Sequence, residues 1–387
     1  MRSKSLLAVL VGTTAVTRVS AQAHLARPVI DTLDHHIVRV MNSGPTAWTD
    51  TNGWKLVYER TVQPADGAPG ELGKISGIAL QSNGRLVEAE TEHPAVQLFG
   101  ADGRFVRAIG REGAGPGEYR NPYVMLYHDS IVVQDQQLHR ATVYDPDGKL
   151  VRSFSSACCA FGVNHWVDDH GHLIANGLRG WEIFDLTGKR LDSLVPPEAE
   201  TFRRWVVRNA SGQTAMSSTV PFSGRNEAMP LHNGSVVYGA TDRYLLLITT
   251  TGRDTVRIFG RSGLQPERVS TAKRDSVYGE MIKRVPAMAG VAKESDIPST
   301  GPLWDDLVQD DAGNIWVTRA VGAKRLIEAD VFTVDGRYLG AVATPFPVHV
   351  GIGAWSRDHL AVFDADENDL PRVRIYRIDR RVRGGGH

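Results

Sequence analysis

Short runs in which apolar and polar residues alternate, separated by polar turns, extend over most of the chain. Residues 96–99 and 105–109 are two such runs, and they flank the tight-turn sequence Gly100-Ala101-Asp102-Gly103. The same run–turn–run pattern recurs at residues 143–154 and 331–340. Alternation of this kind is typical of β-strands, and its recurrence predicts a repeated β-sheet unit.

The turns between the runs fall into two classes, which together give the number of units. The first class lies at Asn83-Gly84, Asp129-Ser130, His170-Gly171, Asn233-Gly234, Ala312-Gly313 and Arg357-Asp358. The second class lies at Asp102-Gly103, Asp147-Gly148, Thr187-Gly188, Thr251-Gly252 and Asp335-Gly336. If each unit is a four-stranded antiparallel meander with strands A to D, the first class joins A to B and the second joins C to D. Six A–B turns and five C–D turns leave the last unit one strand short.

The missing strand is expected from the N-terminal side of the repeats. Residues 54–62 alternate clearly before the first unit, whereas no further alternating run follows residue 378. A ring of repeated sheets exposes two unpaired strand edges unless its ends join, so a strand from one terminus should complete the sheet of the other. The sequence therefore predicts an all-β fold, a six-bladed β-propeller over residues 53–380 that is closed by an N-terminal strand.

Two connections between blades carry insertions, at residues 196–228 and 265–300. Both lie in D-to-A connections, which emerge on one face of a propeller. The first insertion is rich in Ser, Asn, Gly and Thr, and we interpret it as loop. In the second, an apolar stripe from Val269 to Val285 recurs at multiples of four residues and ends before Pro286. This predicts a helix between blades four and five that lies against the propeller and caps one side of the channel.

The N-terminus has the three parts of a signal peptide in order. A basic start is followed by an apolar run over residues 6–16 and by small residues at 19–23. Cleavage is expected after Ala23, with Ala21 as the alternative. No second apolar run approaches the roughly 20 residues that a membrane-spanning helix needs. The prediction is a signal peptide over residues 1–23 and an exported protein, periplasmic or extracellular, with no membrane span.

The segments that flank the propeller carry weaker patterns. Residues 24–52 are expected to be an extended segment, in which His35-His36 and residues 37–40 make a short strand with the two imidazoles on opposite faces. Residues 381–387 are expected to be a flexible tail. Lys plus Arg and Asp plus Glu number 44 each, so the formal net charge is zero, which argues against a nucleic-acid partner.

Three motifs within the repeats resemble those of NHL-type repeat proteins. They are a Tyr-Asp-x-x-Gly hairpin at residues 144–148, a Gly-Pro-Gly-Glu-Tyr connector at residues 115–119, and Asp135 followed by Arg140 before the next strand. Blades one and two match this pattern, whereas blades three and four keep little beyond the hairpin. The resemblance covers roughly residues 53–380 and implies a six-bladed propeller of the bacterial exported type.

The resemblance bears on the fold more than on the function, because this fold carries many activities. Similar proteins include ligand-binding and scaffold modules, gluconolactonase- and paraoxonase-like lactonases, and the amidating lyase of peptide-hormone processing. We expect a binding or scaffold module for an unknown protein or small-molecule partner, with its site at the loop-covered mouth of the channel. The alternative is a metal-dependent lactonase-like hydrolase or lyase with a site on the propeller axis.

Two sets of residues are candidates for the site. Polar residues of the innermost strands would face the axis, and these are Asn164, His165, His232, Asp305, Asp306 and His349. The B-to-C loops share a mouth with the insertions and carry Glu92, His93, Asp135, Arg140, Asp242, Arg243, Arg319, Lys324, Arg325, Asp364 and Arg372. The second set is either a series of Asp–Arg pairs that brace neighbouring blades or a polar rim for ligand or protein recognition.

Neither a metal-ligand set nor a catalytic residue can be assigned from the spacing. Ca²⁺ needs about six to eight oxygen ligands and Zn²⁺ about four ligands, and six blades place some Asp and His near the axis in any case. A divalent cation such as calcium is expected only under the enzyme alternative. Cys158 and Cys159, the only cysteines, form either a strained vicinal disulfide or two reduced thiols.

Overall fold

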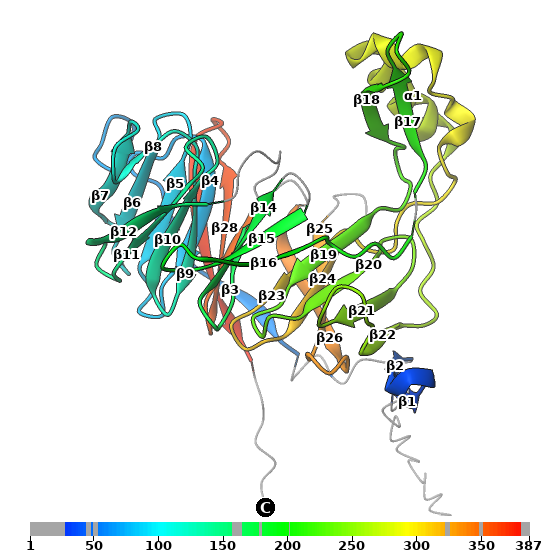
Figure 1. Cartoon of the computed structure of the whole chain (residues 1–387), viewed down its shortest axis with the longest axis horizontal. Helices are drawn as coiled ribbons and strands as arrows, with labels where there is room; N and C mark the ends of the chain where they lie inside the picture. Colours follow the sequence, from blue (N-terminus) through cyan, green and yellow to red (C-terminus); the bar gives the residue numbers. More distant parts are fainter. Residues whose placement is uncertain are drawn as a thin grey trace, which may run out of the picture.

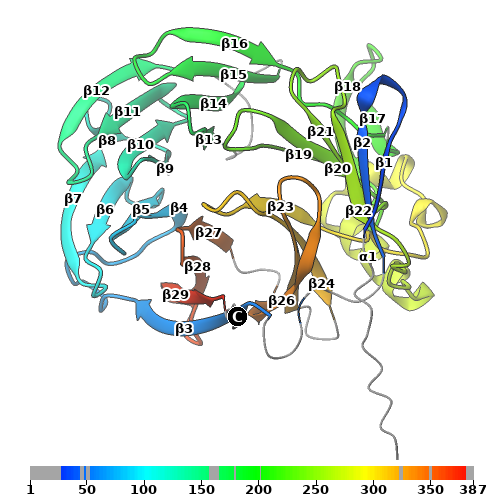
Figure 2. The ribbon, with the colours of Figure 1, turned by 90° about the horizontal axis from the view of Figure 1, so that it is seen from below.

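The computed structural model of the chain is a ring of six β-sheets around a central axis, which confirms the predicted six-bladed β-propeller (Figure 2). It describes residues 28–43, 48, 53–156, 165–177, 180–200, 202–321, 326–347 and 351–380. The predicted signal peptide at residues 1–23, the tail at residues 381–387 and the cysteine pair Cys158-Cys159 lie outside the described residues.

Each blade is a four-stranded antiparallel sheet whose first strand lies nearest the axis (Figures 1 and 2). Blades one to three consist of β4 (Ile75–Leu80), β5 (Leu86–Glu90), β6 (Ala95–Phe99) and β7 (Phe105–Glu112); β9 (Pro122–Tyr127), β10 (Ser130–Asp135), β11 (Arg140–Tyr144) and β12 (Leu150–Ser155); and β13 (Trp166–Val167), β14 (His172–Gly177), β15 (Gly180–Asp185) and β16 (Arg190–Leu194). Blades four to six consist of β19 (Asn226–Pro230), β20 (Val236–Ala240), β21 (Leu245–Thr249) and β22 (Arg257–Arg261); β23 (Asp306–Gln309), β24 (Ile315–Val321), β25 (Leu326–Phe332) and β26 (Tyr338–Pro347); and β27 (Gly351–Trp355), β28 (His359–Ala365), β29 (Pro371–Asp379) and β3 (Lys55–Val62). A short strand β8 (Glu118–Tyr119) adds to β7 in parallel. All six A–B turns and all five C–D turns lie where the sequence predicted them.

The hydrophobic core lies between neighbouring blades. Every residue of β5 is buried, and its two faces contact different partners. Leu86 belongs to the cluster that joins blade one to blade six, whereas Val87 and Ala89 belong to the cluster that joins blade one to blade two. Because successive strand residues point to opposite faces, a strand buried on both sides needs a nearly continuous apolar sequence. β5 departs from this rule at Glu88 and Glu90, which are 0% and 5% exposed, and burial raises the pKa of both carboxyls.

The N-terminal strand closes the ring as predicted. β3 pairs antiparallel with β29, in a register that runs from Val62 opposite Val373 to Lys55 opposite Asp379. The side chain of Val62 is 1% exposed and packs in the cluster between blades six and one. The last blade therefore has four strands, and the sheet edge of β29 is paired.

A second N-terminal element extends blade four. β1 (Val29–Thr32) and β2 (Val38–Asn42) form a hairpin, and β2 pairs in parallel with β22. Asn42 donates to the carbonyls of Gly260 and Gly336 and accepts from the amide of Tyr338, so one buried side chain ties blade four to blade five. The expectation of a strand at His35-His36 is wrong, because both lie in the 3-10 turn η1 (Asp34–His36) with positive φ.

The two insertions form a separate lobe on one face of the propeller, which we call the tower. It contains β17 (Arg204–Arg208), β18 (Thr214–Thr219), α1 (Thr271–Arg284), η2 (Pro286–Gly290) and η3 (Glu294–Asp296). The helix between blades four and five is confirmed, but the first insertion holds an antiparallel hairpin where loop was expected. In both views the tower stands at the rim beside blade four and not over the channel (Figures 1 and 2).

The apolar side of α1 packs on the other insertion and not on the propeller, so the predicted packing is wrong. Met281 of α1 lies in one cluster with Trp205 and Val220 of the first insertion and with Met288 and Ile297 of the second. The indole of Trp205 also donates to Asp296 at 2.8 Å. Each insertion thus covers the apolar surface of the other. Within the described part of the chain, no helix is long and apolar enough to span a membrane.

Candidate functional site

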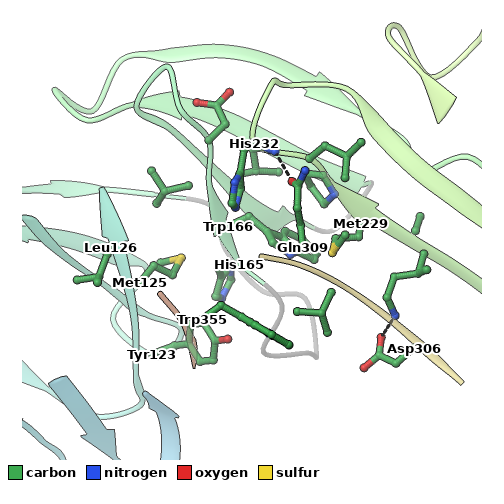
Figure 3. A pocket seen from close by; sticks show the side chains of 18 of the residues that line it. Tyr123, Met125, Leu126, His165, Trp166, Met229, His232, Asp306, Gln309 and Trp355 are labelled. Carbon is green, nitrogen blue, oxygen red and sulfur yellow. Dashed lines mark hydrogen bonds between the residues drawn. The ribbon is translucent and has the colours of Figure 1, made fainter. Parts of the chain in front are cut away.

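A cavity of about 300 Å³ lies on the propeller axis, between the innermost strands (Figure 3). Its lining comes from β9, β13, β19, β23 and β27, and therefore from five of the six blades. These strands all run from the face that bears the tower to the face of the A–B turns. The cavity volume is at the lower end of the range of small-molecule pockets, about 300–1,000 Å³.

The two ends of the cavity differ in chemistry. Glu227 and Asp306 lie at the start of their strands, at the tower-side end. His232 and Gln309 lie beyond or at the end of the same strands, where the amide of His232 donates to Gln309 Oε1 at 2.7 Å. The rings of Trp166, Tyr123 and Trp355 also line the cavity (Figure 3).

Carboxyl groups gather at the tower-side end around one guanidinium. Arg225 donates to Glu227 Oε1 and to the backbone carbonyl of Asp305. Burial among protein raises the pKa of Glu227 in spite of Arg225, and the carboxyls of Asp305 and Asp306 raise it further. Asp306 reaches the solvent of the channel, yet the protein around it raises the pKa of this carboxyl as well, with Asp305 as a smaller cause. The carboxyls therefore repel one another in a partly desolvated place.

His165 is a buried neutral base that also lines the cavity. It is 5% exposed, and burial lowers its pKa to about 4. Its Nε2 lies 3.2 Å from the amide nitrogen of Gln136, which can only donate, so Nε2 accepts and Nδ1 carries the hydrogen. Nδ1 is buried without a hydrogen-bond partner among the described residues. The ring of Tyr123 stands edge-on to the imidazole at 6.0 Å. A donor in this state lacks an acceptor that a ligand can supply.

The structure brings together three of the axial candidates. His165, His232 and Asp306 all line the cavity. Asp305 lies beside it, where its amide donates to Thr318 at 2.7 Å. Asn164 and His349 lie outside the described residues.

Asp135 and Arg140 of the second candidate set bond to backbone groups. Asp135 is fully buried and accepts from the amides of Arg120, Asn121 and Leu138. Arg140 donates to carbonyls of the connector between blades one and two, at Ala114, Gly115 and Glu118. Both side chains fix the course of the chain between blades.

The remaining loop candidates mostly form ion pairs within the protein. Arg372 pairs with Asp364 at 2.8 Å, Arg319 pairs with Glu328, and Arg243 pairs with Glu200. Asp242 is exposed and lies beside Gly224. Lys324 and Arg325 lie outside the described residues. A ligand-binding role for these loop residues stays a prediction.

Sequence reasoning missed Glu227, Trp166 and Trp355. Glu227 fell inside the insertion that was interpreted as loop. A signal for it exists, because Glu227 and Asp306 each stand seven residues before the glycine of the following A–B turn, Gly234 and Gly313. Equal distances from equivalent turns place the two residues at equivalent positions of the innermost strand.

Comparisons with known proteins add little beyond the fold. No protein-family model matches the chain. A segment is 24% identical over 124 residues to the protein Brain tumor of Drosophila melanogaster, which is 31% of this chain and only 12% of that protein's length. A solved member of the DUF4221 family from Bacteroides vulgatus is 12% identical, with a TM-score of 0.49, and the match covers 86% of this chain and all of that one. A streptogramin B lyase is 9% identical with a TM-score of 0.36, and the match covers 84% of this chain and 98% of the lyase. The fold itself rests on the strand order described above, and the NHL resemblance stays a prediction.

Proposed function

We propose that the protein is an exported ligand-binding β-propeller whose axial cavity takes a small organic cation with an apolar body, entering from the tower side. The observation that carries this proposal is the charge of the cavity wall. Among the described residues that line it, Asp168, Glu227 and Asp306 are acidic, and none is Lys or Arg. Burial is the main cause of the raised pKa of both Glu227 and Asp306, and a cation between the two carboxyls would lower both pKa values.

The apolar part of the wall supports the second half of the proposal. Trp166 and Trp355 bring aromatic rings to the lining, and Met125, Leu126 and Met229 bring aliphatic side chains (Figure 3). An ammonium group near aromatic faces gains about 0.5–2 kcal/mol from their quadrupoles. The free Nδ1 hydrogen of His165 adds one place for an acceptor on the ligand.

Three probes of similar size test the charge preference. Phenethylammonium, 2-phenylethanol and phenylacetate share a ring and differ in the charge of the terminal group. Calorimetric titration at pH 7.5 should give a Kd of about 1 mM or below for the ammonium, since nine non-hydrogen atoms supply about 4 kcal/mol at an ordinary ligand efficiency. The alcohol should bind about tenfold more weakly, and the carboxylate should not bind.

Substitutions of two cavity carboxyls test whether phenethylammonium binds in the cavity. Glu227→Gln and Asp306→Asn should each weaken phenethylammonium binding about tenfold, a loss of about 1.4 kcal/mol. Glu328→Gln is the matched control, because this carboxyl pairs with Arg319 away from the cavity lining and should leave the titration unchanged. Equal binding of phenylacetate, or cavity variants that bind like the control, would overturn the proposal.

A further inference from the structure

The first turn of blade three holds three side chains with metal-ligating groups. Asp168 and His170 lie between β13 and β14, His172 begins β14, and one ligand atom from each lies within 4.8 Å of the others. This turn is on the face opposite the tower. It therefore lies at the opposite end of the axial cavity from Glu227 and Asp306.

The backbone fixes the carboxylate of Asp168 and leaves one of its oxygens for the histidines. Oδ1 accepts from the amides of His170 and His172 at 3.0 and 2.8 Å. Oδ2 lies 2.9 Å from His172 Nδ1 and 3.6 Å from His170 Nδ1. The positive φ of Gly171 (74°) closes the turn and brings residues 168, 170 and 172 to one side.

A turn of the same construction in blade five shows that the fold does not need these histidines. There the sequence is Asp310-Asp311-Ala312-Gly313-Asn314, against Asp168-Asp169-His170-Gly171-His172 in blade three. Asp310 Oδ1 accepts from the amides of Ala312 and Asn314 just as Asp168 Oδ1 does in its turn. In blade five, however, Oδ2 accepts hydrogen bonds from the indole of Trp316 and from the side-chain amide of Asn314. The two imidazoles of blade three are thus an addition to a turn that forms without them.

The distances suit a tetrahedral metal ion. Ligand bonds of about 2.0–2.1 Å require ligand atoms about 3.3–3.4 Å apart. Asp168 Oδ2 lies 3.6 Å from His170 Nδ1 and 2.9 Å from His172 Nδ1, a hydrogen bond that a bound metal ion would replace. The imidazole rings of His170 and His172 are nearly parallel, at an interplanar angle of 17°. Two nitrogens and one carboxylate oxygen favour Zn²⁺, Ni²⁺ or Cu²⁺ over Ca²⁺ and Mg²⁺, which prefer oxygen alone.

The surroundings favour a cation with an open coordination position. The side chain of Asp168 is 4% exposed, whereas those of His172 and His170 are 35% and 60% exposed, so a metal ion held by all three would face solvent on one side. Further carboxylates lie near this mouth. Asp310, Asp129 and Asp169 add to burial in raising the pKa of Asp311 to about 6.

We propose that Asp168, His170 and His172 bind one divalent transition-metal ion of the Zn²⁺ class, with at least one position left for water or an external ligand. Asp168 also lines the axial cavity, whereas His170 and His172 do not, and the zinc titration below is done without any organic cation. The test therefore stands whether or not the cavity binds that cation.

The decisive variant copies the blade-five turn into blade three. The protein is prepared without a histidine tag, treated with EDTA and titrated with ZnCl₂ by calorimetry, and Co²⁺ absorption reports the coordination. Wild type should bind one equivalent, and the double substitution His170→Ala with His172→Asn should weaken binding by at least about 100-fold. Since blade five folds with Ala312 and Asn314 at these positions, the metal-free variant should keep its melting temperature.

Two further variants keep the result interpretable. His170→Ala alone removes an exposed ligand and should lower the affinity at least tenfold, which decides the matter if the double variant does not fold. His93→Ala removes an exposed histidine from the opposite face and should leave the titration unchanged. No Zn²⁺ binding by wild type, or equal binding by wild type and the His170 variants, would overturn the proposal.

Discussion

The buried carboxylate of Asp330 between blades four and five lends itself to a quantitative test of what holds the ring together. It is fully buried on β25 and accepts hydrogen bonds from Arg261 at 2.8 Å and from the hydroxyls of Tyr244 and Tyr338. The Arg261 side chain is only 17% exposed and also lies over the ring of Tyr338 at 4.2 Å. Asp330→Ala would leave a buried guanidinium without its main counter-charge and the Tyr244 hydroxyl without its acceptor.

The expected cost of Asp330→Ala is large for one side chain. Breaking a buried ion pair by removing one partner destabilises a protein by about 3–5 kcal/mol. For a folded region of roughly 330 residues, an unfolding entropy of about 2.1 cal/mol/K per residue gives about 0.7 kcal/mol/K in total. The melting temperature should therefore fall by about 4–7 °C.

Urea denaturation and scanning calorimetry measure this loss, with Asp147→Ala as the control. Asp147 also pairs with an arginine of the neighbouring blade, Arg85 at 2.8 Å, but its side chain is 83% exposed. A solvated pair of this kind contributes at most about 1 kcal/mol. The reasoning would be refuted if Asp330→Ala cost no more than Asp147→Ala.

Three other predictions concern acid stability, the tower and ring closure. The pKa of His165 is about 4 in the native protein against 6.5 for an unperturbed histidine, so the free energy of unfolding should fall by about 3 kcal/mol as the pH drops from 6.5 to 4. His165→Gln should remove this loss when urea titrations at pH 6.5 and pH 4 are compared. If the variant keeps the pH dependence of the wild type, this prediction is contradicted. Replacing residues 265–300 alone by a short linker should expose the apolar face of the hairpin and increase the binding of a hydrophobic dye. Replacing residues 202–222 as well should restore low dye binding. Equal dye binding by the two variants would show that the insertions do not cover each other. Deleting residues 28–62 should unpair the edge of β29 and cause aggregation in light scattering, and a soluble, cooperatively folding deletion of unchanged stability would rule out the strand exchange.

The propeller could be predicted from the sequence because its turns carry local signals. Gly84 and Gly103 have φ of 83° and 82°, a conformation that glycine adopts without a steric cost, so the position of each turn is marked by its residue type. The unequal number of A–B and C–D turns then required a strand from elsewhere, and Lys55–Val62 supplies it. The turn positions follow from residues that are neighbours in the sequence, and the need for an extra strand follows from counting the turns, so neither required knowledge of contacts between distant residues.

The tower could not be predicted because its contacts are distant in sequence. The spacing of Val277, Met281 and Val285 shows that α1 has an apolar side, but not what covers it. The covering residues Trp205 and Val220 lie more than 50 residues earlier, in a segment whose Ser, Asn and Gly content suggested loop. A periodic pattern predicts an amphipathic element and does not identify its partner.

The candidate site was predicted in part, for a related reason. His165, His232 and Asp306 were found because each precedes or belongs to a turn or strand that the repeats locate. Glu227 was missed because a degenerate repeat hid the start of β19. The raised pKa values of Glu227 and Asp306 depend on convergence between blades, which sequence spacing does not show.

Photoaffinity labelling tests the central claim, that the axial cavity is the binding site, most directly. The probe is phenethylamine with a diazirine on the ring, and labelled peptides are mapped by mass spectrometry. The account predicts labels on β13, β19 and β27, near Trp166, Met229 and Trp355, that unlabelled phenethylammonium prevents and that the matching phenylacetate probe does not produce. Labels confined to the tower or to outer strands, or labels that phenethylammonium does not prevent, would contradict it.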